Sequence, residues 1–134
     1  MTKLETIEGI GGTYAEQLRQ ANIGSVEALL KAGATPDGRQ QIKDATGIGA
    51  EFILDWVNRA DLMRVRGVGE EYSDLLERAG VDTVVELAQR NAQNLHQTML
   101  QANEEEELVR RPPSQKMVER WVAEAKSLPR AVHY

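Results

Sequence analysis

Apolar residues recur at helical spacing along most of the chain. Within 13–21 and 71–79 they return every three or four positions, which is typical of one buried helix face. The same spacing continues over 26–30 and again after Gly49. No segment alternates apolar and polar residues over the length of a strand. The pattern therefore predicts an all-α protein.

Capping residues predict where several of these helices begin and end. Ser25 and Thr35 are the expected N-caps of two helices, the second with Pro36 at its first position. Thr13 is the expected N-cap of the helix 13–21. Gly80 follows the helix 71–79, where a C-terminal glycine belongs.

The chain contains an internal repeat. TIEGIGGTYAEQLRQANI at 6–23 returns as RVRGVGEEYSDLLERAGV at 64–81, an offset of 58 residues, and FILDWV at 52–57 returns as MVERWV at 117–122, an offset of 65. The second copy therefore carries an insertion within 90–116, expected to be a partly solvated loop. We predict two units, 1–60 and 61–134, which pack as one compact body because no flexible linker separates them.

Composition and charge limit the classes of function that the chain can have. The chain has 134 residues and a net charge of −5, with 6 basic and 8 acidic side chains in 1–60 and 10 and 13 in 61–134. A typical non-specific DNA-binding protein is basic, so this balance counts against DNA unless one face is locally positive. The absence of cysteine excludes disulfides and fits a cytoplasmic location. No segment has the pattern of a membrane span or a secretory leader.

The glycine pairs define a resemblance. GIGGTYAEQL and GVGEEYSDLL resemble the helix-hairpin-helix motif, TGIGAEFILDWV resembles it loosely, and RRPPSQKMVERWV takes the fourth position with Pro and Ser in place of the glycines. Each half resembles a double helix-hairpin-helix unit of the kind found in RecA-like recombinase N-terminal domains and in repair proteins. The whole chain is similar to a bacterial family of tandem helix-hairpin-helix proteins of unknown function.

The resemblance implies contact with nucleic-acid phosphates. Glycine allows a close backbone approach, and the helix that follows the hairpin offers N–H groups to an anion. Glu70 and Glu71 oppose a phosphate at the second hairpin, although acidic residues also suit the first turn of a helix. The candidate nucleic-acid-binding residues are the hairpin glycines Gly9, Gly11, Gly12, Gly67 and Gly69, the adjacent Arg64 and Arg66, and a separate basic cluster of Arg110, Arg111, Lys116 and Arg120.

No residue pattern indicates catalysis. The two histidines, His96 and His133, have no carboxylates at metal-ligand spacing, and His133 is expected to be mobile near the C-terminus. We expect no enzyme activity, no metal and no cofactor. Trp56 and Trp121 occupy equivalent positions of the repeat and are expected to anchor the core rather than to stack on bases.

The sequence leaves two main functions open, with an enzyme subunit whose chemistry lies on another chain as a remote third. The first is a non-catalytic module that binds the DNA backbone, independently of base sequence, through the hairpin 66–72 with assistance from 8–14. The second is a protein–protein adaptor in which the hairpins are only turns, as the acidic balance favours.

Overall fold

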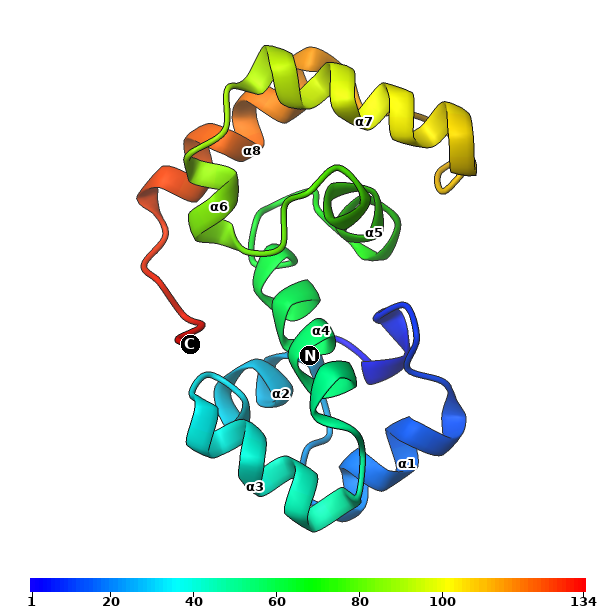
Figure 1. The fold of residues 1–134 in the computed structure, drawn as a ribbon, viewed down its shortest axis with the longest axis vertical. Helices are drawn as coiled ribbons and strands as arrows, with labels where there is room; N and C mark the ends of the chain where they lie inside the picture. The colour runs from blue at the N-terminus through cyan, green and yellow to red at the C-terminus, as the bar shows by residue number, and fades with distance from the viewer. The chain divides into compact units, whose positions relative to one another are not determined.

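The chain consists of helices joined by turns and short loops (Figure 1). The computed structural model describes all of residues 1–134 and contains no strand, which confirms the all-α prediction. The elements in chain order are η1 (Leu4–Thr6), α1 (Gly12–Gln20), α2 (Val26–Ala32), α3 (Pro36–Thr46), α4 (Ala50–Leu62), α5 (Glu70–Arg78), α6 (Val84–Ala88), α7 (Ala92–Glu106) and α8 (Gln115–Ser127).

The chain divides into two compact units. Unit 1 contains Met1–Asp61 and Ala131–Tyr134, and unit 2 contains Leu62–Arg130. The division after Asp61 lies one residue from the boundary expected from the repeat. The last four residues differ from the expectation, because they belong with unit 1 rather than with unit 2.

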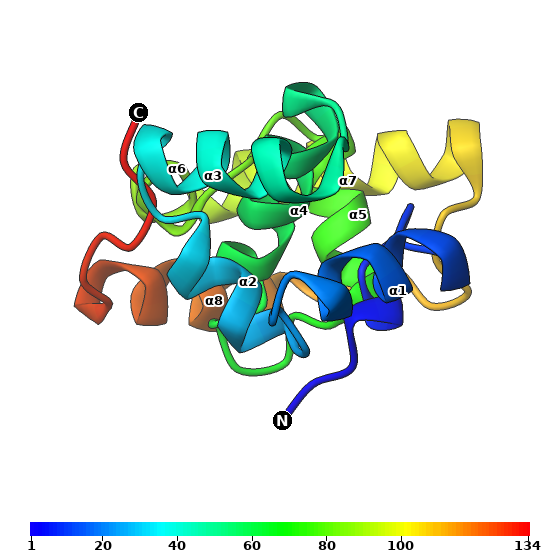
Figure 2. The ribbon, with the colours of Figure 1, turned by 90° about the horizontal axis from the view of Figure 1, so that it is seen from below.

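Hydrogen bonds hold these last four residues in unit 1. The His133 N–H donates to the carbonyl oxygen of Ala34 over 2.8 Å, and the His133 carbonyl accepts from the Arg39 guanidinium over 2.8 Å. Both ribbon views place the C-terminus beside the start of α3 (Figures 1 and 2). The expectation that His133 is mobile was therefore wrong, since its backbone is bonded to a segment 94 residues earlier.

Each unit has its own hydrophobic core. In unit 1, η1 and the helices α1 to α4 bury Leu4, Ile7, Leu18, Leu29, Ile42, Ile53 and Trp56. In unit 2, α8 packs against α6 and α7, and the buried cluster includes Val65, Leu75, Leu76, Leu87, Leu95, Met99, Val118 and Trp121. In both units, the last helix of the unit carries the buried tryptophan.

Side-chain caps begin most of the helices, and glycine begins two. The N-cap side chain accepts an N–H hydrogen bond at Ser25, Thr35, Thr83, Asn91 and Ser114. The helices α1 and α5 follow Gly11 and Gly69 instead, and neither has a side-chain cap. The prediction that Thr13 caps α1 was wrong, because the helix already begins at Gly12.

The insertion in unit 2 is partly helical. The helix α7 continues to Glu106, so the loop expected within 90–116 is confined to residues 107–114. An ion pair of 3.4 Å between Arg78 and Glu106 holds the last turn of α7. Beyond the helix, the Asn103 side-chain oxygen accepts the Val109 N–H over 2.9 Å. These contacts with other parts of unit 2 and with the following loop explain why an acidic run stays helical.

Two carboxylates fasten the N-terminal segment of unit 1 and give it a pH dependence. Hydrogen bonds from the Thr2 backbone and hydroxyl lower the pKa of Glu27, and the Arg19 guanidinium lowers the pKa of Glu5. Groups with a lowered pKa stabilise the folded state above their unfolded pKa, and this stabilisation is lost as the pH falls through the folded value. We expect hydrogen exchange of the Val26 amide, which donates to the Thr2 carbonyl, to accelerate below about pH 4.5 relative to a distant core amide. In Glu27→Gln this acceleration should be smaller, and an unchanged pH profile in that variant would contradict the assignment.

Candidate functional site

The two glycine hairpins have the same backbone conformation. The first glycine of each hairpin is left-handed, with φ of +95° at Gly9 and +90° at Gly67. A side chain strains this conformation, so glycine is required at both positions. The same turn bond also closes each hairpin, from Ile10 to the Ile7 carbonyl over 3.1 Å and from Val68 to the Val65 carbonyl over 3.0 Å.

A tryptophan covers the first glycine of each hairpin. A Cβ atom on Gly9 would lie 3.2 Å from Nε1 of Trp56, and one on Gly67 would lie 3.3 Å from Nε1 of Trp121. Both indoles are buried, with 1% and 3% of their surface exposed. The expectation that they anchor the core is confirmed. Each indole also fixes the hairpin against the last helix of its unit.

A tyrosine of the following helix completes each contact. The ring centroids of Tyr14 and Trp56 lie 5.0 Å apart, and those of Tyr72 and Trp121 lie 5.1 Å apart. The Tyr72 hydroxyl donates to the carbonyl oxygen of Arg111 over 3.0 Å, which ties α5 to the loop before α8. The hairpin, the following helix and the last helix of each unit therefore meet at an aromatic pair.

A pocket of about 450 Å³ lies beside the second hairpin. Its lining comes from the hairpin and from one side of α8, namely Arg66, Gly67, Met117, Arg120, Trp121 and Glu124. Lys116 lies one helical turn before Arg120 and is exposed in the same row of α8. The structure thus places Arg66, predicted from the hairpin, beside Arg120, predicted from a separate basic cluster. We call the exposed residues Arg66, Lys116 and Arg120, with the half-buried Met117 and the Gly67 hairpin, the unit 2 face.

Glu124 is the acidic member of this pocket, and its contact is with the backbone. One of its carboxylate oxygens accepts the Arg66 N–H over 2.9 Å. The carboxylate therefore holds the hairpin to α8 from within the pocket. The sequence reasoning did not single out Glu124 or Met117.

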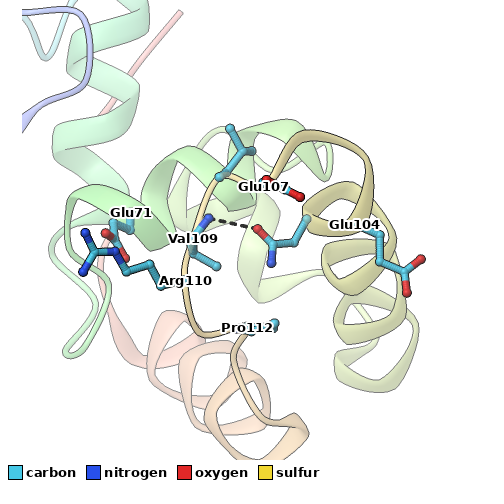
Figure 3. Close-up of a pocket in the computed structure, with 8 residues that line it drawn as sticks. Glu71, Glu104, Glu107, Val109, Arg110 and Pro112 are labelled. Atoms are coloured by element: carbon cyan, nitrogen blue, oxygen red, sulfur yellow. Dashed lines mark hydrogen bonds between the residues drawn. The ribbon is translucent and has the colours of Figure 1, made fainter.

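The other predicted cations lie elsewhere in unit 2. The Arg64 guanidinium donates to the carbonyl oxygen of Pro129 over 2.7 Å, which ties the start of the hairpin to the segment after α8. Arg110 lines a different pocket, of about 750 Å³, with three carboxylates (Figure 3). In this view Glu71 lies at the same end of the pocket as Arg110, and Glu104 lies at the opposite end. The basic cluster 110–120 is therefore divided between an acidic pocket and the unit 2 face.

Unit 1 carries the opposite charges at the corresponding positions. The helices α4 and α8 each have 13 residues and begin 65 positions apart, and the first glycines of the hairpins are 58 apart. These offsets pair Glu8 with Arg66, Glu51 with Lys116, Asp55 with Arg120 and Arg59 with Glu124. The sign of the charge is reversed in every pair.

An exposed aromatic residue lies on α4, next to Glu51 and three positions before Asp55. Phe52 corresponds to Met117 and is 45% exposed, with its ring stacked 6.2 Å from that of Trp56. Asp55 forms an ion pair of 3.3 Å with Arg59, which is itself 5% exposed. We call Glu8, Glu51, Phe52 and Asp55, with the Gly9 hairpin, the unit 1 face.

The fold and the site define an all-α protein whose two units each join a glycine hairpin to a tryptophan-bearing helix. The chain belongs to the family described as Domain of unknown function (DUF4332), whose sequence pattern matches residues 8–128. This range includes both hairpins and both tryptophans. No curated protein and no solved structure matches the chain significantly.

No group of three or more histidine or acidic side chains is placed to hold a metal ion. None of the helices combines the length and the apolar character that a membrane crossing requires.

Proposed function

We propose that the chain is a helix-hairpin-helix module that binds the DNA backbone through the unit 2 face, independently of base sequence. The observation that supports this proposal is the pocket beside the Gly67 hairpin, which both Arg66 and Arg120 line. Two guanidinium groups beside a close-approach glycine suit a phosphate, because Arg presents several donors to its oxygens. A contact of this kind fixes a protein on the duplex without reading bases.

The acidic residues after the hairpin do not line this pocket. Glu71 lines the separate pocket that contains Arg110, and neither Glu70 nor Glu71 lines the pocket beside Gly67. Both glutamates lie in the first turn of α5, where a negative charge complements the helix dipole. Neither glutamate therefore stands in the pocket that Arg66 and Arg120 line.

We further infer that the units are two copies of one double helix-hairpin-helix unit. The matching φ values of Gly9 and Gly67, together with the matching indole contacts, support this inference. The copies differ in charge, so the unit 1 hairpin is not expected to assist. Glu8, Glu51 and Asp55 would repel the phosphate that the unit 2 face attracts.

Fluorescence anisotropy with labelled duplex, single-stranded and branched DNA at low salt tests the proposal. We expect the wild-type chain to bind at micromolar concentration, with an affinity that falls steeply as salt rises. The double variant Arg66→Glu/Arg120→Glu is expected to bind at least about tenfold more weakly, because two phosphate contacts become repulsive.

A matched control separates the face from the net charge. Lys31 and Lys43 are exposed on α2 and α3 of unit 1, and Lys31→Glu/Lys43→Glu changes the net charge by the same amount. We expect this control to bind nearly as well as the wild type. Absence of binding by the wild type, or equal losses in both double variants, would contradict the proposal.

A protein–protein adaptor is the second candidate function. The exposed ring of Phe52, on the same helix as Glu51 and Asp55, favours it, since aromatic residues are enriched in protein interfaces. A partner that docks there should remain bound after nuclease treatment and should be lost in Phe52→Ser. A partner that nuclease removes would instead support DNA binding.

A further inference from the structure

We propose that the chain associates with a second copy of itself, the unit 1 face of one molecule docking on the unit 2 face of the next. The proposal uses the unit 2 face but does not depend on DNA binding. The partner of the acidic unit 1 face is then the basic unit 2 face of another copy of the same chain.

The reversal of charge between the two faces is the first argument. Glu8, Glu51 and Asp55 stand where the other unit has Arg66, Lys116 and Arg120. Because the charge is reversed at all three of these positions, apposing the two faces brings unlike charges together whichever of these side chains face one another. Charge complementarity of this kind steers association and excludes contacts between two identical faces.

The fourth pair of reversed charges is not available for docking. Arg59 is 5% exposed and bonded to Asp55, and Glu124 accepts the Arg66 N–H inside the pocket. Both groups therefore act within their own unit. Of the four pairs, the charges that remain accessible are acidic on the unit 1 face (Glu8, Glu51 and Asp55) and basic on the unit 2 face (Arg66, Lys116 and Arg120).

A second observation is that each face carries an apolar residue at the corresponding position of the repeat, Phe52 in unit 1 and Met117 in unit 2. Phe52 is one of the few large hydrophobic side chains that the chain exposes, at 45%. Met117 is its counterpart and lines the pocket of about 450 Å³ on unit 2. An unbranched methionine adapts its shape and makes favourable sulfur contacts with an aromatic ring. The pocket offers Phe52 of the next molecule an apolar floor with arginines at its edge.

The contact is heterologous, because it joins two different faces. A contact of this type leaves one free face at each end of a dimer, so association continues to rings or to longer chains. The basic face cannot serve DNA and a second copy at the same time. DNA is therefore expected to dissociate the assembly, and assembly is expected to weaken DNA binding.

Sedimentation velocity of the purified chain without DNA tests the proposal. We expect the average mass of the wild type to rise with concentration at low ionic strength and to return to the monomer in high salt. Glu8→Arg/Glu51→Lys makes both faces basic, and Arg66→Glu/Lys116→Glu makes both faces acidic. Each variant alone is expected to associate at least about tenfold more weakly than the wild type, because the two substituted side chains then face charges of the same sign.

Mixing the two variants is the decisive step. The basic variant and the acidic variant should associate with each other in an equimolar mixture, at an affinity close to that of the wild type. The four side chains are exposed, and the Arg66 hydrogen bond to Glu124 comes from its backbone, so both variants are expected to fold. Asp55 is left unchanged because it pairs with Arg59.

Each alternative outcome has a definite meaning. Lys31→Glu/Lys43→Glu should associate as the wild type does, which separates the face from the net charge. A wild type that stays monomeric at low ionic strength, a variant that associates alone as strongly as the wild type, or a mixture that fails to associate would overturn the proposal. None of these outcomes bears on DNA binding, because no DNA is present.

Discussion

Replacing Trp121 with alanine is expected to lower the free energy of unfolding of unit 2 by about 4 kcal/mol. The indole is 3% exposed, packs 5.1 Å from the Tyr72 ring and lies against Gly67. Its removal leaves a cavity between the hairpin, α5 and α8, in addition to the lost burial of a large apolar surface. Urea unfolding followed by circular dichroism measures the loss, and a cost below about 1 kcal/mol would contradict this role.

Trp121→Phe is the matched control for a role in binding. A phenyl ring retains the aromatic contact with Tyr72 while removing part of the buried surface, so a smaller loss of about 1–2 kcal/mol is expected. Since the indole is a floor residue of the pocket, DNA affinity should be nearly unchanged in this folded variant. A large loss of affinity with intact folding would indicate that the indole contacts the ligand.

Gly38→Ala is expected to destabilise unit 1 by about 2 kcal/mol. Alanine normally favours a helix over glycine by about 1 kcal/mol, so a loss here reports a steric conflict. A Cβ atom on Gly38 would overlap with the carbonyl oxygen of Ala32 and would approach the Thr35 hydroxyl to 3.3 Å. The carbonyl belongs to the last residue of α2, and a backbone atom cannot rotate away from the clash.

Gly12→Ala tests the same substitution in open space. A Cβ atom on Gly12 would have no neighbour within 4 Å, and the residue begins α1. This variant is expected to be as stable as the wild type or slightly more stable. Thermal unfolding of both variants measures the contrast, and a Gly38→Ala protein as stable as Gly12→Ala would contradict the close approach of α2 and α3.

The elements that local sequence controls were predictable. Ser25 and Thr35 cap their helices as expected, because each side chain bonds an N–H three residues later. Gly80 also follows α5 with a φ of +92°, as expected for a C-terminal glycine. Thr13 misled the prediction because glycine at N-cap positions leaves no side-chain signal that distinguishes it from the turn before it.

The elements that depend on distant contacts were not predictable from local pattern. Glu106 remains helical because Arg78 pairs with it, and the two are 28 positions apart in the sequence. His133 is held because Arg39 and Ala34 lie beside it in the folded unit. Neither contact produces periodicity or a motif, so composition alone suggested a loop and a loose end.

The candidate site was predicted in pieces. Arg66 was found through the hairpin and Arg120 through its basic neighbours, but nothing local indicates that they share a pocket. A signal did exist in the two repeat offsets. The offset of 65 places Arg120 opposite Asp55 and the offset of 58 places Arg66 opposite Glu8, so the reversal of charge is already present in the order of the residues.

The path of the chain determines the order in which the two units respond to a pulling force. The polypeptide leaves unit 1 after Asp61 and re-enters it at Ala131, so Met1 and Tyr134 belong to the same unit. A pulling force applied between these two residues is first carried by the bonds of the last four residues, such as that from Tyr134 to Asn58 over 2.8 Å. Unit 2 bears no load until those bonds rupture. In an optical trap, the last four residues must therefore detach from unit 1 before unit 2 can be stretched.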